Sequence, residues 1–272
     1  LQIRDDEVAP TSPVVFSDDF DADTAANYTV HFGAENNVDD KVVLFNHDYS
    51  LDGVPSAPNS VGGTTRGLKL TVNKNDATGS AAGVNVYPVG LNVGGDFVLR
   101  FDMFLTFNSA VAGTTEHAIF GVNHGGDRTN RALTGGGKVG GDGVWCAVET
   151  DGSASSGGRS YAIFATTDPA VAPAFTSASA RSFDTFFTSP PFIGIPAGAP
   201  SGRWVNVELW HTNRTATLRI NAVTILSRTN NTPYTSGTIM LGHMDSFNSI
   251  GSTGNYTIFD NVRVIDLNKP RI

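Results

Sequence analysis

The sequence predicts an all-β fold in which two antiparallel sheets pack face to face as a β-sandwich. Three observations predict it: the 272 residues include 30 Gly and 13 Pro, apolar and polar residues alternate along many short segments, and no segment combines a helical period of about 3.6 residues with capping residues. About a dozen strands with one polar face each are what two packed sheets need. We expect a single domain over residues 13–272, preceded by a flexible lead-in over residues 1–12.

The clearest strand is expected over residues 97–105, where every second residue is apolar. That apolar face must belong to the core, so Arg100 and Asp102 point the other way, toward solvent or a groove. Shorter runs of the same kind predict the other strands, at residues 67–72, 83–87, 116–122, 144–150, 161–165, 204–211, 216–220, 238–241 and 256–265. A short helical turn is expected near residues 21–26, with Asp21 or Asp23 as its N-cap.

Two long segments, residues 125–143 and 167–201, are rich in Gly, Ala, Ser and Pro. Neither is followed by a charged or low-complexity linker, so neither divides the chain into domains. Long loops inside a compact domain commonly form the rims of binding sites. We therefore expect them beside a ligand.

The charge balance bears on the class of partner. The formal net charge is −8, and the 18 basic residues are scattered singly, so the sequence offers no basic patch for nucleic acid. No run of about 18 apolar residues predicts a membrane-spanning helix. A surface rich in Asp, Thr, Ser and Asn, with no initiator Met, indicates a processed protein that is secreted or displayed at the cell surface.

Cysteine and the sequons give two further expectations. The single cysteine, Cys146, excludes an internal disulfide and is expected to be a small buried apolar residue. Four Asn-X-Thr sequons occur, although chance explains most of them in a chain so rich in Asn and Thr. They begin at Asn27, Asn213, Asn230 and Asn255.

Four segments stand out together: the stretch Gly202 to Leu209, the hairpin Ala216 to Leu226, the closing Phe259-Asp260-Asn261-Val262-Arg263-Val264 and the opening Phe16 to Asp21. They resemble the hairpins and the terminal strands of concanavalin A-like, laminin-G-like jelly rolls. The inner stretches Gly121 to Gly126 and Asp142 to Gly152 are similar to domains of large secreted bacterial proteins. The resemblance implies a jelly roll whose last strand pairs beside its first. It supports a fold more strongly than an activity, because one fold hosts many functions.

The same resemblance implies a structural Ca²⁺ ion where the first and last strands meet. The matching positions are Asp260, with Asp18 or Asp19. Ca²⁺ takes about six to eight oxygen ligands, so two carboxylates with carbonyls and water would suffice. The alternative is that Asp260 only caps a strand and the acidic pair lies in a solvated turn.

Laminarinase-type hydrolases of this superfamily carry Glu-x-Asp-x-x-Glu on one strand, and retaining hydrolysis needs two carboxylates about 5 to 5.5 Å apart. Glu149 and Asp151 match the start of that motif, but residues 152–154 are Gly, Ser and Ala, so the second Glu is missing. A hydrolase would need a partner for Glu149 from another strand, such as Glu208, Asp102 or Glu116.

Aromatic and polar residues on the outer faces of two predicted strands suggest a sugar-binding groove. Val144, Cys146 and Val148 form the natural core face of one strand, and Val205, Val207 and Leu209 that of the other. A sugar ring needs an aromatic surface for its CH groups and amides or carboxylates for its hydroxyls. The expected ligand-binding residues are Trp145, Glu149, Asp151, Arg100, Asp102, Asn206 and Trp210. Trp145 or Trp204 could instead fill space under a loop.

Other chemistries lack a motif. No zinc-type spacing of His or Cys occurs, and no nucleophile elbow or phosphate-binding loop is present. A lyase could use His117 or His124 with a Tyr, but the signatures of alginate-lyase-like jelly rolls are absent.

The sequence as a whole favours a secreted domain that binds an extracellular glycan without turning it over. A glycoside hydrolase using Glu149 is the first alternative, and a structural, self-assembling surface protein is the second.

Overall fold

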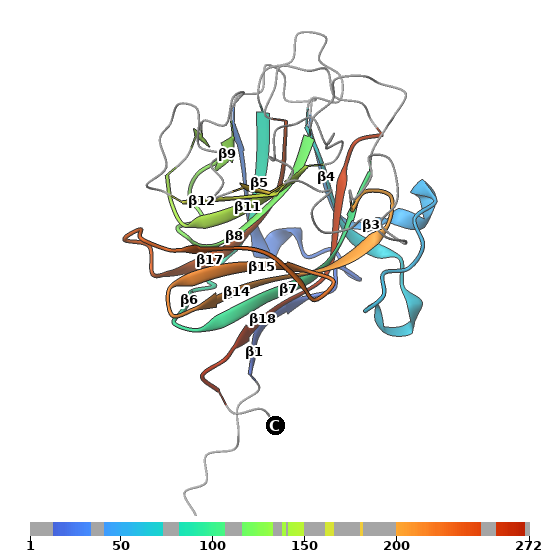
Figure 1. The fold of residues 1–272 in the computed structure, drawn as a ribbon. Helices are drawn as coiled ribbons and strands as arrows, with labels where there is room; N and C mark the ends of the chain where they lie inside the picture. The colour runs from blue at the N-terminus through green and yellow to red at the C-terminus, as the bar shows by residue number, and fades with distance from the viewer. Residues whose placement is uncertain are drawn as a thin grey trace, which may run out of the picture.

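The computed structural model of this chain describes residues 13–33, 41–72, 82–106, 116–132, 138–139, 141–149, 161–165, 180–181, 200–245 and 254–269. The lead-in expected over residues 1–12 lies outside these ranges. The described chain forms two eight-stranded antiparallel sheets, which Figure 1 shows as two stacked layers. The prediction of an all-β, two-sheet sandwich is confirmed.

The first sheet, sheet A, runs through seven strands in hydrogen-bonded order, with β1 pairing onto β18. Its strands are β16 (Val223–Thr229), β15 (Thr215–Ile220), β14 (Trp204–Thr212), β7 (Phe97–Leu105), β18 (Thr257–Asp266), β4 (Arg66–Thr71), β3 (Val42–Asp48) and β1 (Val14–Asp18).

The second sheet, sheet B, has the same number of strands, with β6 pairing onto β17. Its strands are β13 (Ala180–Arg181), β12 (Tyr161–Ala165), β11 (Val144–Glu149), β8 (Glu116–His124), β17 (Ser236–Asp245), β5 (Ala82–Pro88), β2 (Tyr28–Gly33) and β6 (Val93–Gly94). A separate ribbon joins β9 (Arg131–Ala132) to β10 (Lys138–Val139).

The first and last strands lie side by side, as the resemblance implied. In the β1–β18 pair, Phe16 lies opposite Val264 and Asp18 lies opposite Val262, and Figure 1 shows the two strands together at the bottom of the view. Residues from the two ends of the described chain therefore close one sheet.

The core fills the space between the sheets with alternate side chains from each strand. Phe101 of β7 packs edge-on against Phe120 of β8 at 5.0 Å and against Phe259 of β18 at 5.4 Å. The two predicted core faces are confirmed, because all six residues lie in this core: Val144, Cys146, Val148, Val205, Val207 and Leu209. Burial raises the pKa of the Cys146 thiol, so it stays protonated as a small apolar group.

Sheet B differs from the expectation of one polar face for each strand. Its outer face carries a second apolar cluster, in which the rings of Trp145 and Phe164 stack at 4.1 Å. Every described residue of β8 and β11 is buried. Alternate side chains of β8 and β11 therefore point into two different apolar clusters, one between the sheets and one on the outer face of sheet B. They do not alternate between the core and solvent.

Two of the strands that the sequence did not predict, β2 and β3, lie at sheet edges. β2 ends sheet B and β3 ends sheet A, and both are largely half-buried or exposed. An edge strand covers only part of its apolar face, so its alternation of apolar and polar residues is weaker.

The only helices in the described ranges are short 3₁₀ turns: η1 (Ala25–Asn27), η3 (Tyr49–Asp52) and η4 (Val61–Gly63). The helical turn expected near residues 21–26 corresponds to η1. Thr24 occupies its N-cap position without a side-chain bond, and the Asp23 carboxylate accepts the Ala25 N–H at 3.0 Å. No helix of the described chain is long and apolar enough to cross a membrane.

Replacing Phe101 should weaken the sandwich because its ring contacts both sheets. We expect Phe101→Ala to lower the free energy of unfolding by about 3 to 5 kcal/mol through lost burial and a residual cavity. Urea titration followed by fluorescence measures it. The control Leu51→Ala, at a residue that is 81% exposed, should change the free energy by less than about 0.5 kcal/mol. Equal effects of the two substitutions would contradict the assigned core.

Candidate functional site

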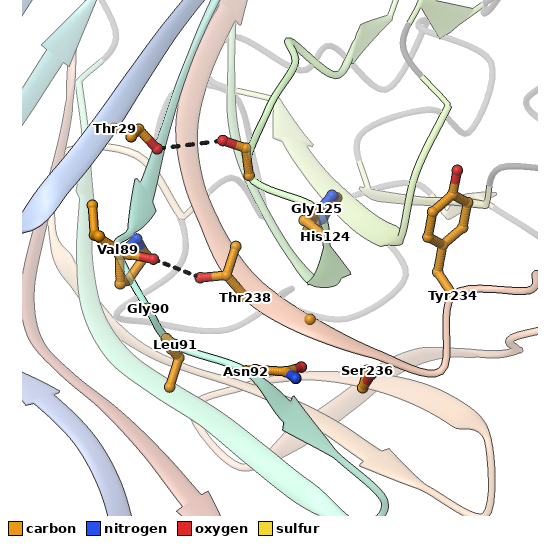
Figure 2. Close-up of a pocket in the computed structure, with 13 residues that line it drawn as sticks. Thr29, Val89, Gly90, Leu91, Asn92, His124, Gly125, Tyr234, Ser236 and Thr238 are labelled. Atoms are coloured by element: carbon orange, nitrogen blue, oxygen red, sulfur yellow. Dashed lines mark hydrogen bonds between the residues drawn. The ribbon is translucent and has the colours of Figure 1, made fainter.

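A cleft of about 430 Å³ opens where β5, β8 and β17 meet. Three segments line it, Pro88 to Asn92 after β5, His124 to Gly126 at the end of β8, and Tyr234 to Thr238 at the start of β17, with Thr29 of β2 beside them. Figure 2 shows Val89, Gly90 and Leu91 on one side and Tyr234 on the other. We call it the end cleft.

Glycine shapes the floor of the end cleft. Gly237 has φ +154, and a Cβ there would lie 2.3 Å from the carbonyl oxygen of His124. The pairing of β17 with β8 also shifts register between Thr238 and Met240. Only glycine lets β17 begin so close to the end of β8.

Two hydroxyl groups tie the walls of the end cleft together. Thr29 donates to the Gly126 carbonyl at 3.3 Å, and Thr238 donates to the Pro88 carbonyl at 3.1 Å. Both bonds join segments far apart in the sequence, and both are drawn in Figure 2. They fix the width of the cleft and use up these two hydroxyl donors.

Three uncharged polar side chains at the end cleft remain available to a ligand. Asn92 and Ser236 are exposed and Tyr234 is half-buried, and none of the three side chains hydrogen-bonds within the described residues. No Asp, Glu, Lys or Arg occurs among the described residues that line the cleft. The site thus offers an amide, a hydroxyl and a phenol with no net charge.

The backbone at Tyr234 is held by its neighbours. The Asn230 amide donates to the Tyr234 carbonyl at 2.9 Å, and the Thr232 hydroxyl accepts the Tyr234 N–H at 3.2 Å. Arg214, in the turn between β14 and β15, donates to the carbonyls of Asn230 and Thr232. The backbone from which the ring extends is therefore fixed by these bonds.

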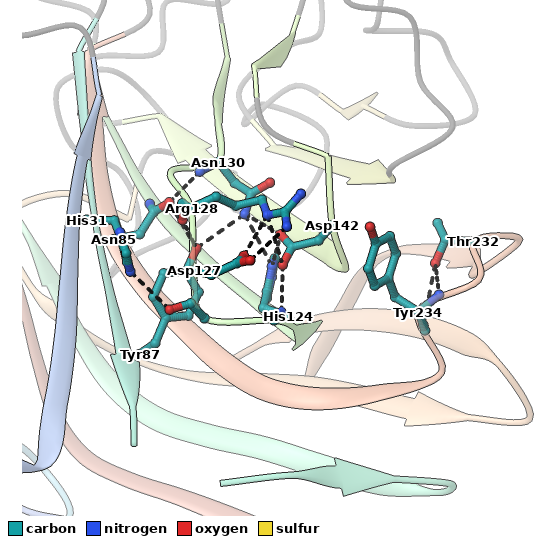
Figure 3. A network of polar contacts seen from close by, with 12 residues as sticks. His31, Asn85, Tyr87, His124, Asp127, Arg128, Asn130, Asp142, Thr232 and Tyr234 are labelled. Carbon is teal, nitrogen blue, oxygen red and sulfur yellow. Dashed lines mark hydrogen bonds and ion pairs between the residues drawn. The ribbon is translucent and has the colours of Figure 1, made fainter. Parts of the chain in front are cut away.

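Behind the end cleft, a buried carboxylate organises the loop that follows β8 (Figure 3). Asp142 accepts the Gly125 N–H at 2.6 Å, the Asn130 amide at 2.7 Å and the His124 Nδ1–H at 3.0 Å. Burial would raise the pKa of Asp142, but the bonds from His124, Gly125 and Asn130 outweigh it and lower the pKa to about 2. Asp142 is therefore ionised at neutral pH and fixes Gly125 at the cleft.

The network continues away from the cleft. The Asn130 amide also donates to the Tyr87 hydroxyl at 3.2 Å, which donates to the Arg128 carbonyl at 2.7 Å. Arg128 and Asp127 form a bidentate pair at the surface, with bonds of 2.7 and 2.9 Å. The charges of Arg128 and Asp127 therefore pair with each other at the surface, outside the residues that line the cleft.

The structure divides the residues that the sequence placed in one groove. Arg100, Asn206 and Trp210 lie on the outer face of sheet A, on β7 and β14. Trp145 and Glu149 lie on the outer face of sheet B, on β11. The expectation of a single groove is wrong, because the two outer faces point in opposite directions.

Of the predicted residues on the outer face of sheet A, Arg100 and Trp210 belong to a cluster around Glu208. Glu208 pairs with Arg100 at 3.0 Å and with Arg219 at 3.4 Å, and accepts the Trp210 indole N–H at 2.8 Å. Trp210 is half-buried, with the Arg100 guanidinium over its ring. This Trp210 patch has its polar groups largely paired with one another.

Three other predicted residues are inaccessible. Trp145 is 1% exposed because it stacks on Phe164, so its ring does not offer a face to a sugar. Asp102 is 0% exposed and accepts bonds from the backbone and the side chain of Asn59. Glu149 is 5% exposed. Asp151 lies outside the described residues.

Trp204 fills space under a loop, the alternative considered for it. Its ring contacts Tyr49 at 5.2 Å and Phe104 at 5.5 Å, and its indole N–H donates to the Pro55 carbonyl.

None of the suggested catalytic pairs with Glu149 forms. Glu208 and Asp102 belong to the outer face of sheet A, and sheets pack about 10 Å apart even before side chains extend outward. Glu116 follows the core-facing register of β8 and bonds to His243 between the sheets. Carboxylates arranged in this way cannot flank one glycosidic bond.

The acidic residues expected to bind calcium have other partners. Asp260 accepts bonds from Tyr49 at 3.0 Å, Ser60 at 2.9 Å and its neighbour's N–H. Asp18 accepts the Tyr28 hydroxyl and the Phe20 N–H, and exposed Asp19 accepts the Asp21 N–H. Asp18 and Asp260 thus have separate sets of donors, which does not fit one shared ion. Within the described ranges, no group of three or more His, Cys, Asp or Glu could hold a metal.

Comparison with known proteins gives the fold. No family model matches the chain, and no curated protein matches its sequence. A Bacillus subtilis protein of unknown function with a galectin-like fold superposes with a TM-score of 0.51 at 10% identity, over 94% of this chain and 97% of that one. Lectin II from Ulex europaeus gives 0.51 at 7% identity, over 92% and 97%. A cellulose-induced protein, Cip1, gives 0.50 at 12% identity, over 94% and 98%.

Identities this low establish the architecture alone. The chain has the concanavalin A-like jelly-roll fold that galectin-like and lectin structures share.

The sequence did not identify Asn92, Tyr234 or Ser236 as site residues. The only sequence signal for these residues is that Pro, Gly, Asn and Ser cluster immediately outside the strands. Such clusters predict loops, but they do not predict which loops lie next to each other in the fold.

Asp260 should make the stability of the protein depend on pH. Burial raises its pKa to about 7, opposed by bonds from Ser60, Tyr49 and Asn261 and assisted by the charge of Asp102. The unfolded value is near 4, so the folded state holds the proton more tightly, and its stabilising contribution is lost as pH rises from about 4 through 7, by at most about 1.4 kcal/mol per pH unit.

Asp260→Asn should remove that slope. Urea unfolding at a series of pH values from 4 to 8, on wild type and variant in parallel, measures the difference. A wild-type free energy of unfolding that falls no faster with pH than that of Asp260→Asn would contradict the assignment.

Proposed function

We propose that this chain is a secreted or cell-surface, lectin-like domain that binds an extracellular polysaccharide of neutral sugars in the end cleft. One observation carries the proposal: the amide of Asn92, the hydroxyl of Ser236 and the phenol of Tyr234 line the cleft and make no side-chain hydrogen bond to another described residue, and no Asp, Glu, Lys or Arg occurs in the described lining.

The chemistry of the cleft matches that of a sugar. A pyranose presents hydroxyl groups around its edge and CH groups on its faces. Uncharged donors and acceptors can bond the hydroxyls, while an aromatic ring and aliphatic side chains such as Leu91 and Val89 can contact the CH groups. A bound hydroxyl replaces water at each polar group, so these groups stay satisfied.

Size and architecture agree with this proposal. The volume of about 430 Å³ falls within the roughly 300 to 1,000 Å³ that small-molecule sites span. The solved structure of Ulex europaeus lectin II, a lectin by name, has the same fold. The proposal does not include turnover, because none of the suggested carboxylate pairs forms.

Substitutions around the end cleft test its role. Tyr234→Ala should weaken binding about tenfold by removing the ring, and Asn92→Ala and Ser236→Ala about fivefold each by removing one hydrogen bond. Affinity electrophoresis identifies a binding polysaccharide from a panel, and calorimetry with its oligosaccharides gives the affinity. The matched control is Trp210→Ala, an aromatic truncation on the outer face of sheet A.

We expect Trp210→Ala to bind as wild type does. Loss of binding in Trp210→Ala with retention in Tyr234→Ala would move the site to the Trp210 patch. Retardation by none of the polysaccharides would reject glycan binding itself.

Salt dependence tests the neutral character of the ligand. Since no Asp, Glu, Lys or Arg lines the described part of the cleft, affinity should change less than about twofold between 0.05 and 0.5 M NaCl. Calorimetric titrations at both salt concentrations measure it. A tighter affinity for acidic polysaccharides that falls steeply with salt would show that charge governs recognition.

A further inference from the structure

The four Asn-X-Thr sequons differ in what the fold does with their asparagine side chains. Asn230 and Asn255 are each 1% exposed, whereas Asn27 and Asn213 are exposed. This difference bears on covalent modification, because a glycan on an asparagine must extend into solvent in the folded protein.

The two buried asparagines have structural roles. The Asn230 amide donates to the Tyr234 carbonyl, and its oxygen accepts the N–H of Thr232. The Asn255 amide points to Glu116 at 3.5 Å. A sugar on either nitrogen would replace a buried N–H and occupy volume that the protein fills.

The two exposed asparagines are free of such roles. Asn213 begins the tight turn between β14 and β15 with φ +47, and only its backbone N–H is engaged, by Asp96. Asn27 ends η1, and its carbonyl accepts the Val89 N–H. Neither side-chain amide hydrogen-bonds to any described residue.

We propose that Asn27 and Asn213 are sites of N-linked glycosylation and that Asn230 and Asn255 are not. The proposal rests on the export included in the proposed function, but not on glycan binding. The donor is an oligosaccharide on a lipid pyrophosphate. The asparagine Nδ2 attacks the anomeric carbon, a C–N bond forms, the C–O bond to pyrophosphate breaks, and the amide loses one proton while the lipid pyrophosphate leaves.

The test is secretion of the full chain from a eukaryotic host that performs this transfer. Peptide N-glycosidase F in ¹⁸O-labelled water converts each glycosylated asparagine to labelled aspartate, which peptide mass spectrometry locates. We expect label at positions 27 and 213 only. Asn27→Gln and Asn213→Gln should each remove one glycan, whereas Thr29→Ser and Thr215→Ser, which preserve the sequons, should retain both.

Two outcomes would overturn the proposal. One is secreted wild type with no label at position 27 or at position 213. The other is a labelled position 230 or 255 in the secreted Asn27→Gln/Asn213→Gln double variant. The same double variant, titrated with the polysaccharide, separates this result from the fate of the end cleft, because neither asparagine lines it.

Discussion

The structure depends on one constraint above all, that each sheet buries an apolar face against the other sheet. Residues such as Phe101, Phe120 and Phe259 meet in that shared layer from three strands. The end cleft forms where the ends of β5 and β8 meet the start of β17.

Buried polar groups are the second requirement, because a charge without partners inside the protein is costly. Asp142 satisfies it by accepting bonds from His124, Gly125 and Asn130. The result is a rigid loop at the edge of the cleft. On sheet A, the carboxylates of Asp102 and Asp260 likewise accept hydrogen bonds, from the side chains of Asn59 and Ser60, and so fix that segment against the sheet. In each case a buried carboxylate anchors a loop, and two of the three, Asp102 and Asp260, are residues that the sequence suggested as ligand-binding groups.

The sequence could predict the fold because alternation is a local property. The core face of Phe97 to Leu105 follows from nearby residues. The pairing of the first and last strands joins distant residues, and it was expected only because the resemblance implied it. The site could not be predicted in the same way. Which outer face a residue occupies depends on which sheet its strand joins, so Trp145 and Trp210 were grouped although they lie on opposite sheets. Tyr234 was missed because its position depends on distant Arg214.

The end cleft has one consequence for the behaviour of the molecule as a whole. Its lining residues lie between Thr29 and Thr238 and come from strands β2, β5, β8 and β17 and the segments joined to them, so no single hairpin contains it. A ligand that binds there, as proposed above, would bind the folded sandwich and not the denatured chain. By mass action such a ligand would favour the native state, and in its presence the domain would resist unfolding more than its own packing provides.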